Sequence, residues 1–514
     1  MDNYIKESKS GMRVQAPICD RQIVTELTSD FTLPDYQPEI KRLLRVRATV
    51  SPPDKYIGAG NAEFSGTVDY AILYAGNDGA LYCATETSEY QFTVPTEVPS
   101  DFELNDGLIC DAEVLTDTVT GRVAAPRKFS VKCRLRSRVR LYGTKLIEEI
   151  VGGAEPDSLQ RLCGNVDSAS LFVGIGDPLQ LGDEILCDAQ SGDIRVIAAE
   201  GQVFVNEATA GSGVVNCRGE VCLKLLCAQE GEQTPPSALL RRIPFTQAIA
   251  TDGAEVNCDA CANGICTEMQ ITVEENRILC EVTLRLRTRA QRNQNLSFTR
   301  DIYSTAAECE SRYTDCVFPR ALKCVNGNFS LNTTLPLEEV GIRPNMSIAD
   351  ITLAPTVTSL ECDHGKYYLT GRCRALAILF DGEDFSAQEF EVPFRYETDG
   401  TEESVTDHDA TVDVISCRAR LDGERIGIDA ELAVSLATRG ECRFQMLSEA
   451  RFGEKISRSG AVYTICYPSR EDTLWSVAKR YHRSVASVSD INSLAGSPAA
   501  DSAESLAGVG YLLV

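Results

Sequence analysis

The chain has 514 residues, 43% of them hydrophobic and 24% charged, which is the composition of an ordinary globular protein of several domains. Asp and Glu (75) outnumber Lys and Arg (50), and the formal charge of −25 disfavours binding to nucleic acid or to anionic membranes. The three histidines lie far apart in the sequence, so neither a multi-histidine metal site nor a Ser-His or Cys-His catalytic pair is expected.

The N-terminal residues are charged and polar and no apolar stretch follows them, so we expect no secretory signal peptide. No run of 18 apolar residues predicts a membrane span. The 21 cysteines are therefore expected to be reduced in a cytosol, most of them as small hydrophobic residues of strands. Cys258, Cys261 and Cys266 form the one cluster. Because no second Cys-x-x-Cys follows nearby, no metal or cofactor is predicted, with metal binding at this cluster as the alternative.

A threefold repeat with a period of about 150 residues runs through most of the chain. Its first marker is a glycine at the start of an apolar run, and the spacings between successive copies are 153 and 152 residues. The copies are Gly66, Gly219 and Gly371. The second marker is a basic residue that opens a run of alternating residues, with spacings of 149 and 148. These copies are Lys128, Arg277 and Arg425. Because two independent markers keep one period, we expect three related domains at 1–150, 151–305 and 306–455.

Alternation with a period of two dominates each unit. Phe129, Val131 and Cys133 share one face of such a run, which predicts an antiparallel strand with one face buried. Asp78-Gly79 and Asp422-Gly423 are typical of hairpin turns between strands. One short helix is expected at 39–44, after a proline. Each unit is therefore predicted to be an antiparallel β-sandwich or open barrel.

The other face of the first unit's strand carries a ladder of basic side chains. These are Lys132, Arg134, Arg136, Arg138 and Arg140. Either they contact nucleic acid, or they form a solvated face that pairs with acidic residues of a neighbouring strand such as Asp111 and Glu113. The acidic total favours pairing. So do Asp429 and Glu431, which occupy the matching positions of the third unit and reverse the sign of the charge.

The pattern changes near Gly460. A strand-like run at 462–465 is followed by a helical stripe of four apolar residues, which are Leu474, Val477, Ala478 and Tyr481. Asp472 is expected to cap this helix, and Ser484 to begin a second helix that carries Val488. The last four residues, 511–514, predict a closing strand. The expected order is strand, helix, helix, strand.

This segment, 460–514, resembles a LysM module in its Asp-Thr-Leu-Trp sequence at 472–475, its Ala-x-x-Tyr at 478–481 and its Asp-Ile-Asn at 490–492. The resemblance implies a shallow groove that binds N-acetylglucosamine-containing glycans. The residues that would border the groove are Asp472, Thr473, Leu474, Ile491 and Asn492. The alternative is a protein-docking domain in which Leu474 and Trp475 are core residues.

The whole arrangement resembles the SPOCS-domain proteins of spore-forming Firmicutes, and among them the SipL-type spore coat morphogenetic proteins. The first unit carries their Leu-Pro…Pro-x-Ile-x-x-Leu segment at 33–43 and their Gly…Ile-Leu-Tyr strand at 66–74. The resemblance implies three tandem SPOCS units followed by an α+β LysM module, in a scaffold of the mother-cell cytoplasm at the forespore surface. In that family the LysM module binds the ATP-hydrolysing protein of the coat's basement layer.

Two further classes stay open. One is a wall- or cortex-associated protein whose LysM module holds the glycan of peptidoglycan. The other is an enzyme with an unrecognised site, such as a cortex-processing hydrolase. No nucleophile elbow, phosphate-binding loop or paired-carboxylate motif stands out in the sequence, so we expect no enzymatic activity. Coat proteins are the expected partners, with peptidoglycan as the alternative and nucleic acid excluded.

Overall fold

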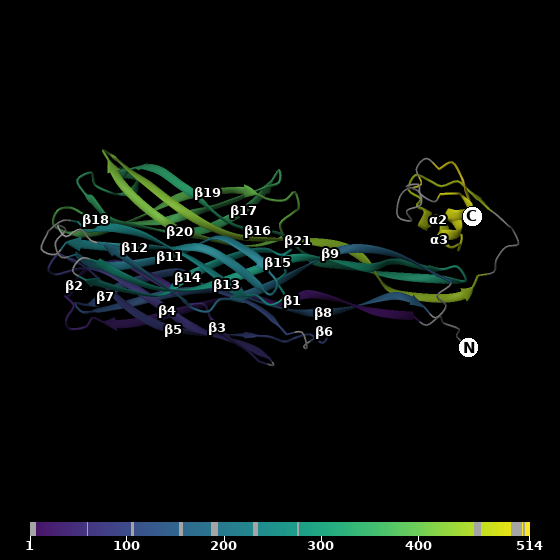
Figure 1. Cartoon of the computed structure of the whole chain (residues 1–514), viewed down its shortest axis with the longest axis horizontal. Helices are drawn as coiled ribbons and strands as arrows, with labels where there is room; N and C mark the ends of the chain where they lie inside the picture. The colour runs from purple at the N-terminus through teal and green to yellow at the C-terminus, as the bar shows by residue number, and fades with distance from the viewer. Residues whose placement is uncertain are drawn as a thin grey trace.

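The computed structural model of the chain describes residues 7–58, 60–103, 107–153, 158–186, 194–229, 235–274, 277–456, 464–494, 506 and 509–514. The chain is mainly β, with 78% of residues in strands and 4% in helices, as the sequence predicts. All strand pairs are antiparallel within the described ranges. Figure 1 shows an elongated molecule with a broad body at one end and a small module at the other.

The first β-unit consists of two sheets that face each other across one core. Its strands are β1 (Glu7–Thr32), β2 (Ile40–Val50), β3 (Asp54–Ile57), β4 (Asn61–Gly76), β5 (Leu81–Pro95), β6 (Phe102–Glu103), β7 (Ile109–Ala125) and β8 (Lys128–Gly153). One sheet has the order β1-β8-β6 with β7 also on β8, and the other has the order β2-β4-β3 with β5 also on β4. Phe64, Phe92, Phe129, Val131 and Cys133 lie in the core between the sheets. The inward face predicted from the alternation at 129–133 is therefore confirmed.

The second β-unit repeats this pairing in one continuous sheet. Its strands are β9 (Leu159–Ile175), β10 (Leu179–Leu186), β11 (Ile194–Gly211), β12 (Val214–Gln229), β13 (Ser237–Ala250), β14 (Asp259–Glu274) and β15 (Arg277–Ser304). The order is β10-β15-β14-β11-β12-β13, with β9 also on β15. A single pair, Gln202 and Ile265, joins β11 to β14. This pair connects what in the first unit are two separate sheets, so the second unit is closer to an open barrel.

The third β-unit is again a two-sheet sandwich. Its elements are β16 (Ala307–Pro336), α1 (Leu337–Val340), β17 (Ser347–Asp363), β18 (Lys366–Phe380), β19 (Phe385–Asp399), β20 (Asp407–Asp422) and β21 (Arg425–Lys455). The sheets have the orders β16-β21-β20 and β17-β18-β19. In all three units the last strand lies between the first strand and the strand before the last, so the sheet architecture repeats as the sequence markers do.

The short helix expected at 39–44 is wrong, because this segment is the start of β2. Ile40 pairs with Gly76 and Leu43 with Tyr74 of β4. The pairing with β4 supplies the backbone hydrogen bonds, and this tertiary contact outweighs local helix preference. The two predicted hairpins are confirmed, because β4–β5 and β20–β21 are paired and turn at Gly79 (φ 80°) and Gly423 (φ 60°). Glycine reaches this left-handed region without steric cost.

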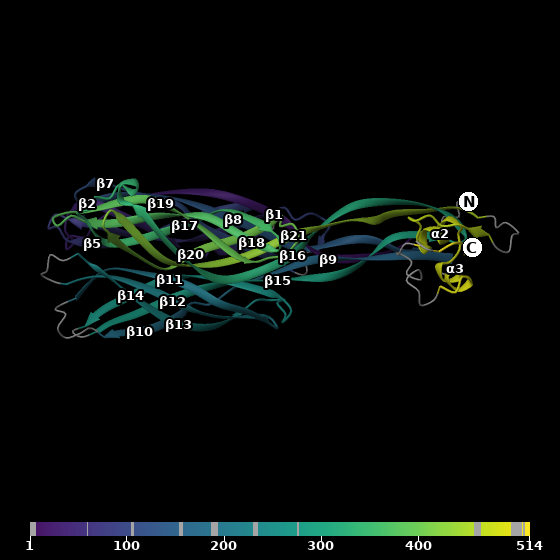
Figure 2. The ribbon, with the colours of Figure 1, turned by 90° about the horizontal axis from the view of Figure 1, so that it is seen from above.

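The three units lie side by side with their strands along the long axis of the molecule (Figures 1 and 2). At one level they share an apolar cluster to which each unit contributes, including Leu44, Ile197 and Ile378. The units therefore pack into one body instead of following one another as beads on a rod.

The first and last strands of each unit continue beyond the body and form a stalk (Figure 1). These strands are long, and β16 and β21 have 30 and 31 residues. Within the stalk, side chains from the three units meet in one apolar layer, which includes Met12, Phe298 and Met446. The ring centroids of Phe298 and Phe444 are 4.5 Å apart. The stalk is therefore a small hydrophobic core of its own, built jointly by all three units.

We predict that Phe298→Ala loosens the stalk in all three units, because the lost ring packs against the third unit. A buried Phe→Ala change costs about 3–5 kcal/mol. Hydrogen exchange followed by mass spectrometry is expected to rise in residues around Met12 and Phe444 as well as around 298. The control is Tyr36→Ala, an exposed aromatic on the body. A rise confined to the second unit would contradict a shared stalk core.

Candidate functional site

The C-terminal module has the predicted order of elements. Its elements are β22 (Ile465–Cys466), α2 (Leu474–Arg480), α3 (Val485–Ile491) and β23 (Leu512–Leu513), and β22 pairs with β23. Leu474, Val477, Ala478 and Val488 are buried in its core, so the helical stripe points inward as predicted. Residues 462 and 463 of the predicted first strand lie outside the described residues.

The cap of α2 is Thr473, and the prediction that Asp472 caps this helix is wrong. The Ser476 backbone N–H donates to Thr473 Oγ1 (3.1 Å), and the Thr473 N–H donates to Ser476 Oγ (3.0 Å), which makes a reciprocal capping box. Asp472 stands one residue earlier, where it accepts hydrogen bonds from the Ser469 N–H (2.9 Å) and from Arg480 (2.6 Å). These bonds, that from Ser469 first, lower the pKa of Asp472.

The other predicted groove residues have separate places. Leu474 and Trp475 are both buried in the core of the module. The protein-docking alternative expects this position for both residues. The Asn492 side chain ties the end of α3 to β23, because it donates to the Leu513 carbonyl (2.7 Å) and accepts from the Leu513 N–H (2.7 Å). Ile491 is 39% exposed. Of the five residues, Ile491 presents the most apolar surface, whereas the polar groups of Asp472, Thr473 and Asn492 hold the module together.

The sequence analysis missed an exposed apolar face on the two-stranded ribbon of the module. Ile465 is 57% exposed, Tyr467 76% and Tyr511 59%. Cys466 and Leu512, which follow Ile465 and Tyr511 in the chain, are buried in the module core. Alternation along these two short strands therefore directs one side inward and leaves the other side, here called the ribbon face (Ile465, Tyr467 and Tyr511), open to solvent.

The module is attached to the tip of the stalk through Asp301 of β15. Trp475 Nε1–H donates to Asp301 (2.8 Å), Lys479 Nζ lies 2.7 Å from both carboxylate oxygens, and the Tyr313 hydroxyl donates at 2.7 Å. Burial alone would raise the pKa of Asp301, but the hydrogen bonds from Lys479, Trp475 and Tyr313 outweigh it and lower the pKa. One ionised carboxylate thus joins α2 to the stalk.

Further contacts complete this attachment. The Tyr303 hydroxyl donates to the Arg483 carbonyl (2.7 Å), and its ring meets Trp475 edge-on with centroids 4.8 Å apart. The Val485 N–H at the start of α3 donates to Gln160 Oε1 of β9 (3.2 Å). The module therefore uses α2 and the turn between its helices for the stalk, and the ribbon face is not among these contacts.

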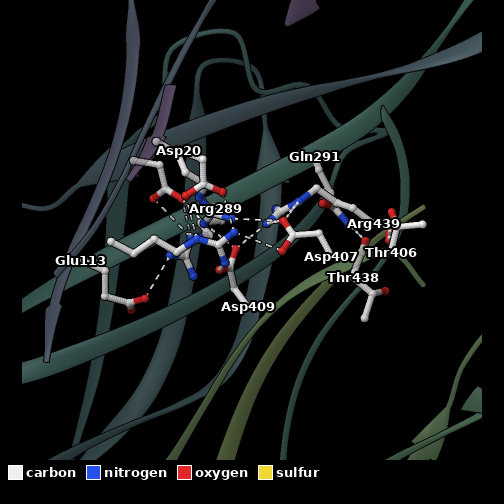
Figure 3. A network of polar contacts seen from close by, with 12 residues as sticks. Asp20, Glu113, Arg289, Gln291, Thr406, Asp407, Asp409, Thr438 and Arg439 are labelled. Carbon is white, nitrogen blue, oxygen red and sulfur yellow. Dashed lines mark hydrogen bonds and ion pairs between the residues drawn. The ribbon is translucent and has the colours of Figure 1, made fainter. Parts of the chain in front are cut away.

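A second polar site lies inside the body, where charged side chains of all three units meet (Figure 3). This axial cluster consists of Asp111, Arg140, Arg287, Arg289, Asp407, Asp409 and Arg439. Arg140 of the first unit bridges Asp111 of its own unit and Asp409 of the third, both at 2.5 Å. Burial would raise the pKa of Asp409, but Arg289, Arg140 and Arg439 outweigh it and hold the pKa far below its usual range.

The basic side chains of the ladder on β8 are therefore buried at one end of the strand and exposed at the other. Its pairing with Asp111 is as predicted, but the expectation of a solvated face is wrong at Arg140, which is buried between units. Arg134, on the same face of the strand, has a half-exposed side chain beside Asp117. The difference arises because only one end of the ladder faces the neighbouring units.

A second group of buried ion pairs borders a cavity of about 750 Å³ that is lined by all three units. Arg45 bridges Glu200 and Asp350 at 2.6 Å each, and Lys224 also pairs with Asp350. Burial would raise the pKa of Glu200, but Arg45 and Arg47 outweigh it and lower the pKa to about 2. Glu200 is thus held as a paired carboxylate at neutral pH, which does not suit it to general acid catalysis.

The candidate metal ligands Cys258, Cys261 and Cys266 are all buried. Across the described part of the chain, no three His, Cys, Asp or Glu side chains gather in a way that could hold a metal ion. None of the helices described here has the length and apolar character that crossing a bilayer requires. No family model, curated protein or solved structure matches this chain.

We predict that Asp301→Asn loosens the module from the stalk, because the amide cannot compensate the half-buried charge of Lys479. Losing hydrogen bonds to a charged group in this partly exposed contact costs about 1.5 kcal/mol, which raises the detached population roughly tenfold. Hydrogen exchange around Tyr303 and in α2 is expected to increase. The matched control is Glu310→Gln, an exposed acid of β16. Unchanged exchange in α2 would contradict a contact held by Asp301.

A third prediction concerns Asp413 of β20, whose pKa is raised to about 6 by burial and by Glu113, against an opposing effect of Arg47. Its contribution to stability is present below the unfolded pKa of about 4 and is lost as the pH rises through about 6. Asp413→Asn is therefore expected to raise the free energy of unfolding by about 3 kcal/mol at about pH 7.5 and by about 1 kcal/mol at about pH 4.5. Urea unfolding of both chains at the two pH values measures this, and an equal difference at both would contradict it.

Proposed function

We propose that this chain is a non-enzymatic scaffold of spore coat assembly that works in the mother-cell cytoplasm at the forespore surface. On this proposal the three β-units at 1–150, 151–305 and 306–455 are SPOCS units, and 460–514 is a LysM module. The module docks on the ATP-hydrolysing protein of the coat's basement layer, and the body contacts other coat proteins.

One observation carries the proposal: the module is held at the tip of a stalk by one face, while its ribbon face is exposed. Asp301 and Tyr303 engage α2 and the turn behind it, and Tyr467 and Tyr511 remain more than half exposed. Exposed aromatic side chains are enriched at protein–protein interfaces. A stalk that places such a face away from the body suits a protein that joins two structures.

The interior of the body supports a structural role over a catalytic one. Four of its buried acids, Asp111, Glu200, Asp350 and Asp409, are ion-paired with arginine or lysine. An acid that is ionised and paired on both sides has no proton to give and little freedom to attack a substrate. These groups hold the units together, which is what a scaffold needs.

Binding to peptidoglycan is the second candidate, favoured by the two exposed tyrosines of the ribbon face. Their rings offer flat apolar surfaces with a polar hydroxyl at the edge, a combination that suits sugar rings. The module would then anchor the chain to cortex or wall glycan.

The test compares full-length wild type with the double variant Tyr467→Ala/Tyr511→Ala. Its control is Tyr36→Ala/Tyr56→Ala, which removes two equally exposed tyrosines of the body. We expect the first variant to bind the purified basement-layer ATPase at least about tenfold more weakly, and the control to bind like wild type. Purified peptidoglycan serves as the second bait.

Retention on peptidoglycan without ATPase binding would overturn the scaffold proposal in favour of the glycan-binding one. Equal ATPase binding by all three chains would remove the ribbon face as the docking surface. A fluorescent fusion in sporulating cells adds an independent check, because it is expected at the forespore surface in wild type and to be dispersed in the ribbon-face variant.

A further inference from the structure

Two cysteines from different units lie against each other inside the body. Cys261 on β14 belongs to the second unit and Cys324 on β16 to the third, and their thiols are hydrogen-bonded. Cys261 is buried and Cys324 is half-buried, so Cys324 lies nearer to the solvent of the two. No disulfide joins any two cysteines of the described residues.

Asn326, two residues after Cys324, makes hydrogen bonds to the backbone next to Cys261. The Ala262 N–H, next to Cys261, donates to Asn326 Oδ1 (3.0 Å), and Asn326 Nδ2 donates to the Ala262 carbonyl (2.8 Å). The same amide group also reaches the Val205 carbonyl of β11 (3.4 Å). These bonds join the segments that carry Cys261 and Cys324 across the boundary between the second and third units.

The surroundings make the two thiols chemically different. Hydrogen bonds from Cys324 and Ser435 and the charge of Arg289 lower the pKa of Cys261 although burial opposes them, whereas the hydrogen bond to Cys261 and burial raise the pKa of Cys324. Burial raises the pKa of the nearby Cys217 to about 12. A lowered pKa increases the thiolate fraction of Cys261, and a thiolate beside a second thiol can form a disulfide.

We propose that Cys261 and Cys324 are an oxidation-sensitive pair whose disulfide locks the second unit to the third. With hydrogen peroxide as oxidant, the Cys261 thiolate attacks one peroxide oxygen, the O–O bond breaks, and the leaving hydroxide takes up a proton to become water. Cys261 is then a sulfenic acid. The Cys324 sulfur attacks the Cys261 sulfur, the S–O bond breaks, and the oxygen leaves as a second water with the thiol proton of Cys324. Two thiols are oxidised and one peroxide is reduced.

The consequence is a covalent bond across an interface that is otherwise held by ion pairs and apolar contacts. The two cysteines are 63 positions apart in the sequence, so the bond closes a loop that includes the whole connection from β14 to β16. A cross-link of this kind restricts the unfolded chain and opposes separation of the units. The oxidised body would therefore resist unfolding more than the reduced one.

The experiment treats the purified full-length wild type with hydrogen peroxide, blocks the remaining thiols with an alkylating reagent and analyses the tryptic peptides by mass spectrometry. We expect one peptide pair joined between Cys261 and Cys324, lighter than the sum of its parts by two hydrogens and separable by dithiothreitol. The midpoint of thermal unfolding is expected to rise on oxidation and to return on reduction.

Two variants sharpen the test. Cys324→Ser removes the second thiol, so the joined peptides should disappear and Cys261 should accumulate as sulfinic acid. Cys217→Ser is the control, because Cys217 is a buried neighbour of Cys261 and should leave the cross-link intact. Joined peptides between Cys217 and Cys261, or oxidation of other cysteines with this pair left reduced in wild type, would overturn the proposal, and neither result requires a variant to fold.

Discussion

The buried charges between the β-units are the constraint on which the rest of the structure depends. Arg140 pairs with carboxylates of the first and third units, Asp111 and Asp409. Arg45 pairs with carboxylates of the second and third units, Glu200 and Asp350. A buried charge is costly unless it is paired, so these side chains are satisfied only when all three units are in one alignment. Apolar contacts alone tolerate sliding, whereas ion pairs that cross three units do not. The apolar clusters at other levels contribute the bulk of the burial, and the charged groups select the register.

That register has a structural consequence far from the charges. Because the units are aligned, their first and last strands leave the body at the same level and can share a core around Phe298 and Met446. The stalk in turn presents Asp301 and Tyr303 at its tip, where the terminal module sits (Figure 1). The position of the module is thus linked through long strands to contacts deep inside the body. A chain with one unit shifted would lose the shared stalk core and with it the platform for the module.

Sequence reasoning reached the elements that depend on local pattern, and it failed where another unit decides the outcome. Alternation at 129–133 predicts which side chains share a face, and the stripe from Leu474 to Val477 predicts an inward-facing helix side. The same alternation places Arg134 and Arg140 on one face and predicts equal exposure for both. The Arg134 side chain is half-exposed, whereas that of Arg140 is buried. Nothing local separates them, because the difference lies in what another unit places opposite. The short helix expected at 39–44 failed because of a tertiary contact within the same unit, where the segment pairs with β4. Asp472 and Thr473 are both good capping residues, so sequence cannot choose between neighbours.

The candidate site follows the same division. Its core residues could be predicted from the helical stripe, but the ribbon face could not, since strands of two residues are too short for alternation to be recognised. Tyr467 and Tyr511 differ from the rest of the module in their position. The module contacts the stalk through α2 and the turn between its helices, whereas these two rings are exposed to solvent. If the module existed only to cap the stalk, a polar outer face would serve it better, because exposed apolar side chains stabilise nothing within the chain. In the proposed scaffold, this apolar face at the far end of the stalk is the surface that a binding partner would cover, and the ion-paired acids of the body hold the three units together.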